Sequence, residues 1–270
     1  MNAPEKIQPG ALPDVQSSRD TRRLAIQQVG IRDFKHPVMV QTASGPQPSV
    51  ATIEMTVALP AEEKGTHMSR FIEVFQNHDE AIDFESFNRL MDKMLARLDA
   101  RGGAMQVALP FFVRKTAPIS EVSSLMDYQI TWSTSVEAGH RVTCLTVVVP
   151  VTSLCPCSKN ISDYGAHNQR SHVTIQAELA CGMSVESLIG VAEKAASCEL
   201  WGLLKRPDEK YVTERAYDNP KFVEDLVRDV AMSLQADTRI SAFTVESENF
   251  ESIHNHSAYA RIEHRPAAKA

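Results

Sequence analysis

The sequence lacks the features that would place the chain in a membrane, outside the cell or on a nucleic acid. No apolar run in its 270 residues approaches the ~20 residues that a membrane-spanning helix needs. Residues 1–20 are polar and contain prolines, so we expect no signal peptide there. The formal net charge is -6, which disfavours nucleic acid as a partner but is compatible with a local basic pocket for a small anion. We therefore expect a cytoplasmic protein with no membrane and no nucleic-acid partner.

Cysteine is scarce and odd in number. There are five cysteines, at positions 144, 155, 157, 181 and 198. In a large chain without an export signal, this number favours reduced thiols over a disulfide framework.

The sequence also lacks a phosphate-binding loop and a dinucleotide glycine fingerprint, so any nucleotide would be bound by another scheme. The remaining composition, 43% hydrophobic and 23% charged, is typical of a globular protein.

The hydrophobic period changes in an ordered way along the chain, and it predicts two successive groups of elements. In the first half we expect strands at about 36–43 and 50–59, helices at 67–77 and 83–100, and strands at 104–114 and 124–136. In the second half we expect strands at about 140–152 and 171–180, a helix at 184–204, a polar loop, a helix opened by Asn219-Pro220, and strands at 238–247 and 256–264. The predicted order is therefore ββααββ twice.

This order predicts an α+β architecture in which hairpin-connected strands form antiparallel sheets with helices packed on one face. The expected organisation is an N-terminal arm over 1–25, a first module over 26–138, a second module over 139–265 and a tail over 266–270. Such sheets have open edges, which other subunits often cover.

The densest group of reactive residue types follows the apolar run Leu145 to Val151. Cys155 and Cys157 flank Pro156. An extended chain would direct both thiols to one side, although a bend at the proline fits equally well. Two buried packing residues are the alternative, because free cysteine behaves as a small hydrophobe. The polar neighbours, including Lys159, favour a reactive site.

His167 lies twelve positions after the first thiol, in a polar, glycine-containing segment that predicts a loop. A lone histidine in a loop is usually a solvated side chain, but its closeness to the two thiols favours a metal site. Three protein ligands and an open position are typical of a catalytic metal site. The third ligand is open at this point: Cys157, a later carboxylate or a later histidine would each serve.

Two acidic residues of the second half are ambiguous. Glu209 lies in a highly charged segment where a solvated turn is the default interpretation. Glu224 falls in the second turn of the helix expected after Asn219-Pro220, four residues before Arg228. It could form an ordinary ion pair with that arginine. Alternatively, its carboxylate could accept two parallel hydrogen bonds from a planar N–H/NH2 edge such as that of guanine.

Histidines mark two further places. His254 and His256 lie at the entry to the last expected strand and would share a face if the chain is extended there, which suits metal binding or proton transfer. Two surface histidines at a strand end are the alternative. His67 and Arg70 begin the first expected helix, where backbone N–H groups and a cation suit an anionic ligand.

Taken together, these motifs resemble the prokaryotic type IB GTP cyclohydrolase I family. The resemblance covers nearly the whole chain, in the expected order. It is carried by residues 153–159, 166–171, 208–214, 219–225 and 251–258, with 67–71 and the segment from Asp14 to Arg22 in support. It implies a tunnelling fold of two ββααββ modules, a homotetramer with interfacial active sites, and conversion of GTP and water to 7,8-dihydroneopterin triphosphate and formate. The product would enter folate biosynthesis or, in some bacteria, deazaguanine modification of tRNA.

The resemblance also implies roles for individual residues. The implied metal ligands are Cys155, His167 and Glu209; the implied catalytic residues are the thiol of Cys157 and the imidazoles of His254 and His256; the implied guanine anchor is Glu224. The cations expected near the triphosphate are His67, Arg70, Lys159 and Arg170. The resemblance leaves the divalent metal open among zinc, manganese and iron(II), because members of the family accept several divalent ions. A mixed S/N/O ligand set likewise does not strongly select one ion.

Two other functions remain alternatives at this stage. One is a related pterin or deazaguanine enzyme, such as a nitrile reductase that uses the thiol as nucleophile with NADPH and no catalytic metal. The other is a non-catalytic assembly whose Cys/His cluster is a structural zinc site, which would need four protein ligands.

Overall fold

The computed structural model describes residue 16 and residues 18–266. Most of the expected N-terminal arm, including Asp14, and the tail beyond Pro266 lie outside the described residues.

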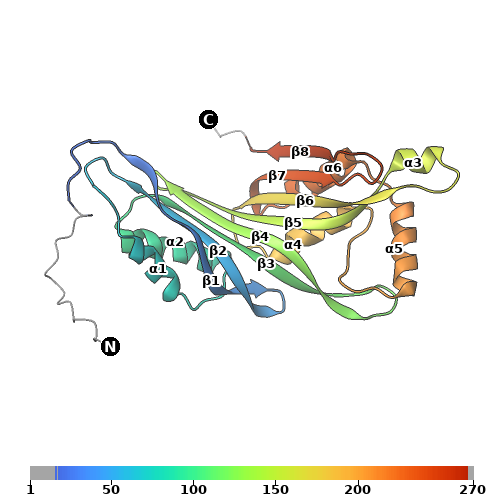
Figure 1. Ribbon diagram of the computed structural model, residues 1–270, viewed down its shortest axis with the longest axis horizontal. Helices are drawn as coiled ribbons and strands as arrows, with labels where there is room; N and C mark the ends of the chain where they lie inside the picture. The colour runs from blue at the N-terminus through green and yellow to red at the C-terminus, as the bar shows by residue number, and fades with distance from the viewer. Residues whose placement is uncertain (1–15, 17, 267–270) are drawn as a thin grey trace, which may run out of the picture.

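Eight strands form one antiparallel sheet in which neighbours in the chain are neighbours in the sheet (Figure 1). The strands are β1 (Ile26–Thr42), β2 (Gly45–Leu59), β3 (Gly103–Thr116), β4 (Ser123–Glu137), β5 (His140–Leu154), β6 (Asn168–Leu179), β7 (Ile240–Asn249) and β8 (Ala258–His264). Among the described residues, β1 and β8 each pair on one side only, so they are open edges.

Helices occur in both halves of the chain. They are α1 (Met68–Gln76), α2 (Phe84–Leu98), α3 (Pro156–Ile161), α4 (Val185–Ala195), α5 (Arg206–Asp218) and α6 (Val223–Gln235). Helices α1 and α2 pack against the strands of the first half, and α4 and α6 against those of the second. Helices α3 and α5 lie at one end of the sheet (Figure 1).

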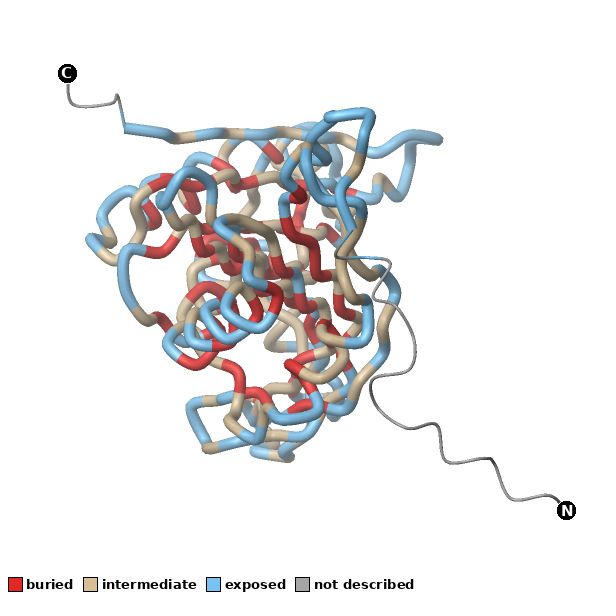
Figure 2. The backbone as a smooth tube through the Cα atoms, turned by 90° about the vertical axis from the view of Figure 1, so that its left-hand side faces the viewer, coloured by how far each residue is buried: buried red, intermediate tan, exposed pale blue. Residues whose placement is uncertain are grey.

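Burial alternates along the strands because one face of the sheet packs against the helices. In β5, every second residue from Leu145 to Val151 is buried, and the residues between them are less so. Because side chains alternate between the two faces, only one face of the sheet is fully covered. Most buried residues of both halves form one continuous core between the sheet and the helices (Figure 2), and a small second cluster contains Leu154, Cys198 and Ala216.

The sheet is continuous across the boundary between the two expected modules. β4 pairs with β5 from Gln129–Val148 to the turn at Glu137–His140, in the same antiparallel manner as the other neighbours. The doubled ββααββ order and the α+β class are confirmed, with α3 and α5 as additions in the second half. No helix among the described residues is long and apolar enough to cross a membrane.

Several expected boundaries were wrong, and β1 begins at Ile26, ten residues before the strand expected at about 36–43. The helix expected over 184–204 ends at Ala195, and the polar loop expected after it is largely helix α5. Asn219 does not open the following helix but caps the end of α5, and α6 begins at Val223. Glu224 therefore lies in the first turn of α6 and not in the second.

Candidate active site

The site begins where the β5–β6 ladder ends. The last pair of the ladder is Leu154–Asn168, and beyond it the Cys155 N–H donates to the carbonyl of His167 (3.1 Å). Cys155 has an extended backbone and caps α3, whose first residue is Pro156. The chain therefore bends at the proline. Cys155 is half-buried and Cys157, one residue into the helix, is exposed.

Hydrogen bonds hold the imidazole of His167 at one nitrogen. Its Nδ1 lies 3.1 Å from Gln169 Oε1 and 3.2 Å from Ser252 Oγ, while Gln169 Nε2 donates to Glu251 Oε1 (3.3 Å). The amide nitrogen of Gln169 faces a carboxylate, so its oxygen faces His167 and accepts from Nδ1–H. This arrangement leaves Nε2 as the nitrogen with a free lone pair, which is the form that binds a metal.

The same network reaches the two later histidines. Nδ1 of His254 lies 3.3 Å from Glu251 Oε2, so one carboxylate joins Gln169 to His254. His254 and His256 stack with ring centroids 5.2 Å apart and planes 23° apart. They share a side as expected, but on a bent loop, because β8 begins only at Ala258. The structure thus connects His167, His254 and His256 through Glu251.

Glu209 lies in the first helical turn of α5 and not in the solvated loop that was expected there. Its side chain is exposed. Val212 and Ala216, three and seven residues further on, pack with Leu154 and Ala166, which directly precede Cys155 and His167. Glu209 is therefore on the side of α5 that faces the end of β5.

The residue before it, Asp208, is fully buried. Burial acts to raise the pKa of Asp208, but hydrogen bonds from Ser120, Lys205 and Ile119 outweigh it and hold the pKa well below its usual range. Asp208 was not singled out from the sequence, although an acid placed just after Pro207 is a recognised signal for a helix start.

Glu224 stands at the start of α6, beside the same strand end. The N–H of Lys221 donates to the carbonyl of Leu154 (3.1 Å), which ties this helix start to the residue before Cys155. Glu224 is exposed, and its side chain forms no hydrogen bond or ion pair within the described part of the chain. Arg228 does not form the alternative ion pair with Glu224 in the described structure. Its Nη1 lies instead 3.9 Å from Asp225 Oδ1.

The four cations expected near the triphosphate do not converge within one chain. Arg170 is exposed on β6 beside the site. The Lys159 Nζ donates to the carbonyl of Tyr217 (2.5 Å) and lies over its ring, so it is attached to α5. His67 caps α1 and Arg70 lies within that helix. α1 and α3 are at opposite ends of the molecule (Figure 1).

The donor set suits a divalent metal, although one chain does not gather it completely. Sulfur, imidazole and carboxylate ligands together fit zinc, manganese or iron(II). Cys155 and His167 are adjacent through their backbone hydrogen bond, and His167 has its Nε2 free. No group of three or more His, Cys, Asp or Glu side chains close enough to hold a metal ion occurs among residues 16 and 18–266.

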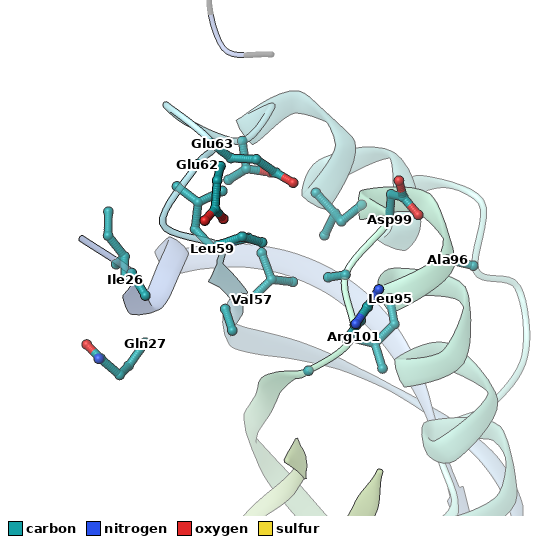
Figure 3. A pocket seen from close by; sticks show the side chains of 17 residues that line it. Ile26, Gln27, Val57, Leu59, Glu62, Glu63, Leu95, Ala96, Asp99 and Arg101 are labelled. Carbon is teal, nitrogen blue, oxygen red and sulfur yellow. The ribbon is translucent and has the colours of Figure 1, made fainter. Parts of the chain in front are cut away.

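Two hollows differ in their relation to these residues. A cavity of about 530 Å³ between α5 and the loop before β6 is lined by Leu154, Tyr164, Ala166 and Tyr217, so it adjoins the site. A cavity of about 790 Å³ lies near the start of β1, between the end of β2 and the end of α2. Figure 3 shows acidic side chains and Arg101 around this second cavity, and none of the predicted site residues lines it.

Comparison with solved structures defines the class of fold. The uricase from Arthrobacter globiformis superposes with a TM-score of 0.51 at 10% identity, covering 90% of this chain and 95% of the uricase chain. A hyper-thermostable mutant of AgUricase matches with the same TM-score at 12% identity, over 92% of this chain and 94% of the mutant chain. At such low identity the likeness shows the fold alone, and that fold is the tunnelling fold.

Comparison of sequences gives the family. The model of the type I GTP cyclohydrolase folE2 family matches residues 12–260, and the chain belongs to this family. It is 59% identical over 258 residues to GTP cyclohydrolase FolE2 of Ralstonia nicotianae, covering 95% of this chain and 96% of the relative. It is 60% identical over 253 residues to GTP cyclohydrolase FolE2 of Janthinobacterium sp., covering 94% of each.

Proposed function

We propose that the protein hydrolyses the guanine imidazole ring of GTP, releases formate and forms 7,8-dihydroneopterin triphosphate, as a cytoplasmic enzyme of folate biosynthesis. Family membership over residues 12–260 supports the activity. The observation that supports the proposal in the structure is the junction between the end of β5 and the start of β6, where Cys155, His167 and the Glu251–His254 pair lie close together.

One divalent metal ion is the implied cofactor, and Cys155, His167 and Glu209 would hold it. When bound, such an ion supplies Lewis acidity that brings the pKa of a water toward neutrality. The contribution of the chain is to orient the ligands. Gln169 and Ser252 hold His167 at Nδ1, and the packing of α5 against Leu154 sets the side from which Glu209 approaches.

Ring opening and formate release both need protons moved at ring nitrogens, and three residues near the ligands can move them. The Cys157 thiol is exposed one helical position beyond Pro156. His254 and His256 form a stacked pair with Glu251 at Nδ1 of the first, so protons can pass between solvent and the site. We assign Cys157 to the substrate side and the histidine pair to proton delivery.

Substrate binding uses the exposed groups. The exposed carboxylate of Glu224 accepts the N–H/NH2 edge of guanine, and Arg170 and Lys159 lie at the same end of the molecule. His67 and Arg70 reach the triphosphate from another copy, because α1 is remote from α3 in one chain. This requirement and the open edges of β1 and β8 support a homotetramer with interfacial active sites.

The test is to incubate the purified full-length protein with GTP and measure the fluorescence of the oxidised pterin product. Product should form with added divalent metal, disappear with chelator and return when metal is restored. Absence of product with each of zinc, manganese and iron(II) would refute the proposed reaction.

A further inference from the structure

Asp208 has an unusually complete set of partners for a carboxylate next to an exposed functional residue. Its Oδ1 accepts from the backbone N–H groups of Ile119 (2.9 Å) and Ser120 (2.8 Å). Its Oδ2 accepts from the Ser120 hydroxyl (2.5 Å) and the backbone N–H of Lys205 (2.8 Å). The side chain is fully buried, so these four donors replace water entirely.

Three of these donors come from the other half of the chain. Ile119 and Ser120 belong to the turn between β3 and β4, nearly ninety positions away, whereas Lys205 caps α5 itself. The carboxylate therefore joins the first turn of α5 to a turn of the first module. Trp201 adds a second link, because its Nε1 donates to the carbonyl of Thr116 (3.0 Å).

The other contacts of helix α5 with the rest of the chain lie beyond its first turn, among them the ion pair of Arg215 with Glu199 (2.9 Å) and the packing of Ala216 against Leu154. Asp208 and Ala216 are its only buried residues, and Ala216 is two turns further along. The rotation and axial position of the first turn therefore depend mainly on the hydrogen bonds of Asp208. Glu209 is the next residue, so any displacement of that turn moves its carboxylate directly.

We propose that Asp208 is a positioning residue that fixes Glu209 for metal binding by attaching the start of α5 to the β3–β4 turn. The proposal rests on the proposed function, in which Glu209 is a metal ligand. It also means that the first half of the chain controls the geometry of a metal site whose ligands all lie in the second half.

The test compares metal affinity in full-length variants, using Mn²⁺ alone as the probe in competition with a chelator. Asp208→Asn keeps the size of the side chain but turns one acceptor into a donor that faces other donors. We expect its affinity for Mn²⁺ to fall by roughly tenfold or more, as for the loss of other groups that orient a ligand. At saturating Mn²⁺ its turnover of GTP should recover, which separates positioning from direct participation in catalysis.

Asp225→Asn is the matched control. Asp225 occupies the same position in α6, accepts from the N–H of Phe222 (3.1 Å) and precedes no proposed metal ligand. Its variant should bind Mn²⁺ like the wild type. Ser120→Ala removes one of the four bonds and should give an intermediate loss, and it replaces Asp208→Asn as the deciding variant if the latter fails to fold.

Glu209→Gln separates the two levels of the proposal. If Glu209→Gln loses Mn²⁺ while Asp208→Asn and Ser120→Ala bind it like the wild type, Asp208 has no positioning role and the metal site stands. If Glu209→Gln itself binds Mn²⁺ normally, the assignment of the ligand fails and the inference fails with it.

Discussion

At the scale of single residues, Gln169 is the side chain that the chemistry of His167 depends on most directly. It is buried, it faces Nδ1 of His167 with its oxygen and Glu251 with its nitrogen, and both bonds can form only with the amide in one orientation. A leucine of similar size would leave Nδ1 with Ser252 alone and would free the ring to rotate or change tautomer.

We therefore expect Gln169→Leu to weaken metal binding by roughly 10–100-fold, the usual effect of removing a group that orients a metal-binding histidine. The measurement is chelator competition followed at neutral pH. Gln176→Leu is the control, because Gln176 lies on the same strand with an exposed side chain. An equal loss of affinity in both variants would show that the effect comes from β6 as a whole.

Cys155 and His167 could be singled out from the sequence at this scale, but the residues that hydrogen-bond to His167 could not. Cys155 and His167 are unusual residues in a polar segment, and twelve residues of separation suffice for a strand end to return to its neighbour. Gln169 and Ser252 are ordinary polar residues whose importance arises only when β6 and the loop after β7 meet. The β6–β7 register that brings them together spans Ser171–Asn249 to Leu179–Ile240, which spacing along the chain does not reveal.

At the scale of elements, α5 shows where periodicity fails. Its buried residues are Asp208 and Ala216, so it has no apolar stripe to give a helical period. In the segment before α5 the prediction erred in the opposite direction, because it placed a helix where the chain is not helical. Ala196 and Cys198 are buried in an extended stretch that pairs Cys198 with Thr152, and their apolar character extended the preceding helix too far in the prediction.

The attachment of α1 to β1 contains a pH-sensitive group. Both ring nitrogens of His78, just beyond α1, are buried without a hydrogen-bond partner in the described structure. The ring contacts Phe75 edge-on (6.3 Å between centroids), and Phe75 in turn contacts Phe34 and His36 of β1. Burial, assisted by the charge of Lys93, lowers the pKa of His78 below its usual value.

This shift has a defined sign. Because the folded protein holds His78 neutral, the unfolded chain takes up the proton first, and stability falls as the pH drops below about 6.5. His78→Leu should reduce the loss of melting temperature between about pH 7.5 and pH 5.5, by roughly 2–4 °C for each kcal/mol regained. His172, whose pKa burial also lowers, keeps some acid sensitivity in the variant.

The control for this prediction is His140→Leu, since the side chain of His140 is exposed at the start of β5. Melting curves for both variants and the wild type at the two pH values form the measurement. If His78→Leu melts with the same pH dependence as the wild type, the buried imidazole does not set it.

At the scale of the whole molecule, the fold could be predicted well because buried and less buried residues alternate along most strands of the sheet. The exception is β1, of which only the part after about residue 36 was expected. Its first residues are largely exposed, interrupted by two register shifts, and only Val38 and Val40 are buried. An edge strand without a buried face carries no period-two pattern, so its length cannot be predicted from hydrophobicity.

An assembled active site predicts complementation between inactive subunits. Arg70→Ala and Cys157→Ala should each abolish or strongly reduce turnover. α1 and α3 lie far apart in one chain, so a site that needs both must combine two copies. The two variants are co-expressed with different tags and purified as mixed oligomers. They should recover up to about a quarter of wild-type activity, since random assembly combines an intact Arg70 and an intact Cys157 at about one site in four.

The control is to mix the separately purified variants without subunit exchange, which should remain inactive. A mixed oligomer as inactive as its parents would show that Arg70 and Cys157 do not serve one shared site.

The central claim is that Cys155 holds the metal and Cys157 acts on the substrate. The most direct test measures bound metal and formate release from GTP on the same preparations of Cys155→Ala and Cys157→Ala. We expect Cys155→Ala to lose both metal and turnover, whereas Cys157→Ala should keep its metal and lose turnover. Equal loss of metal in the two variants would contradict this claim.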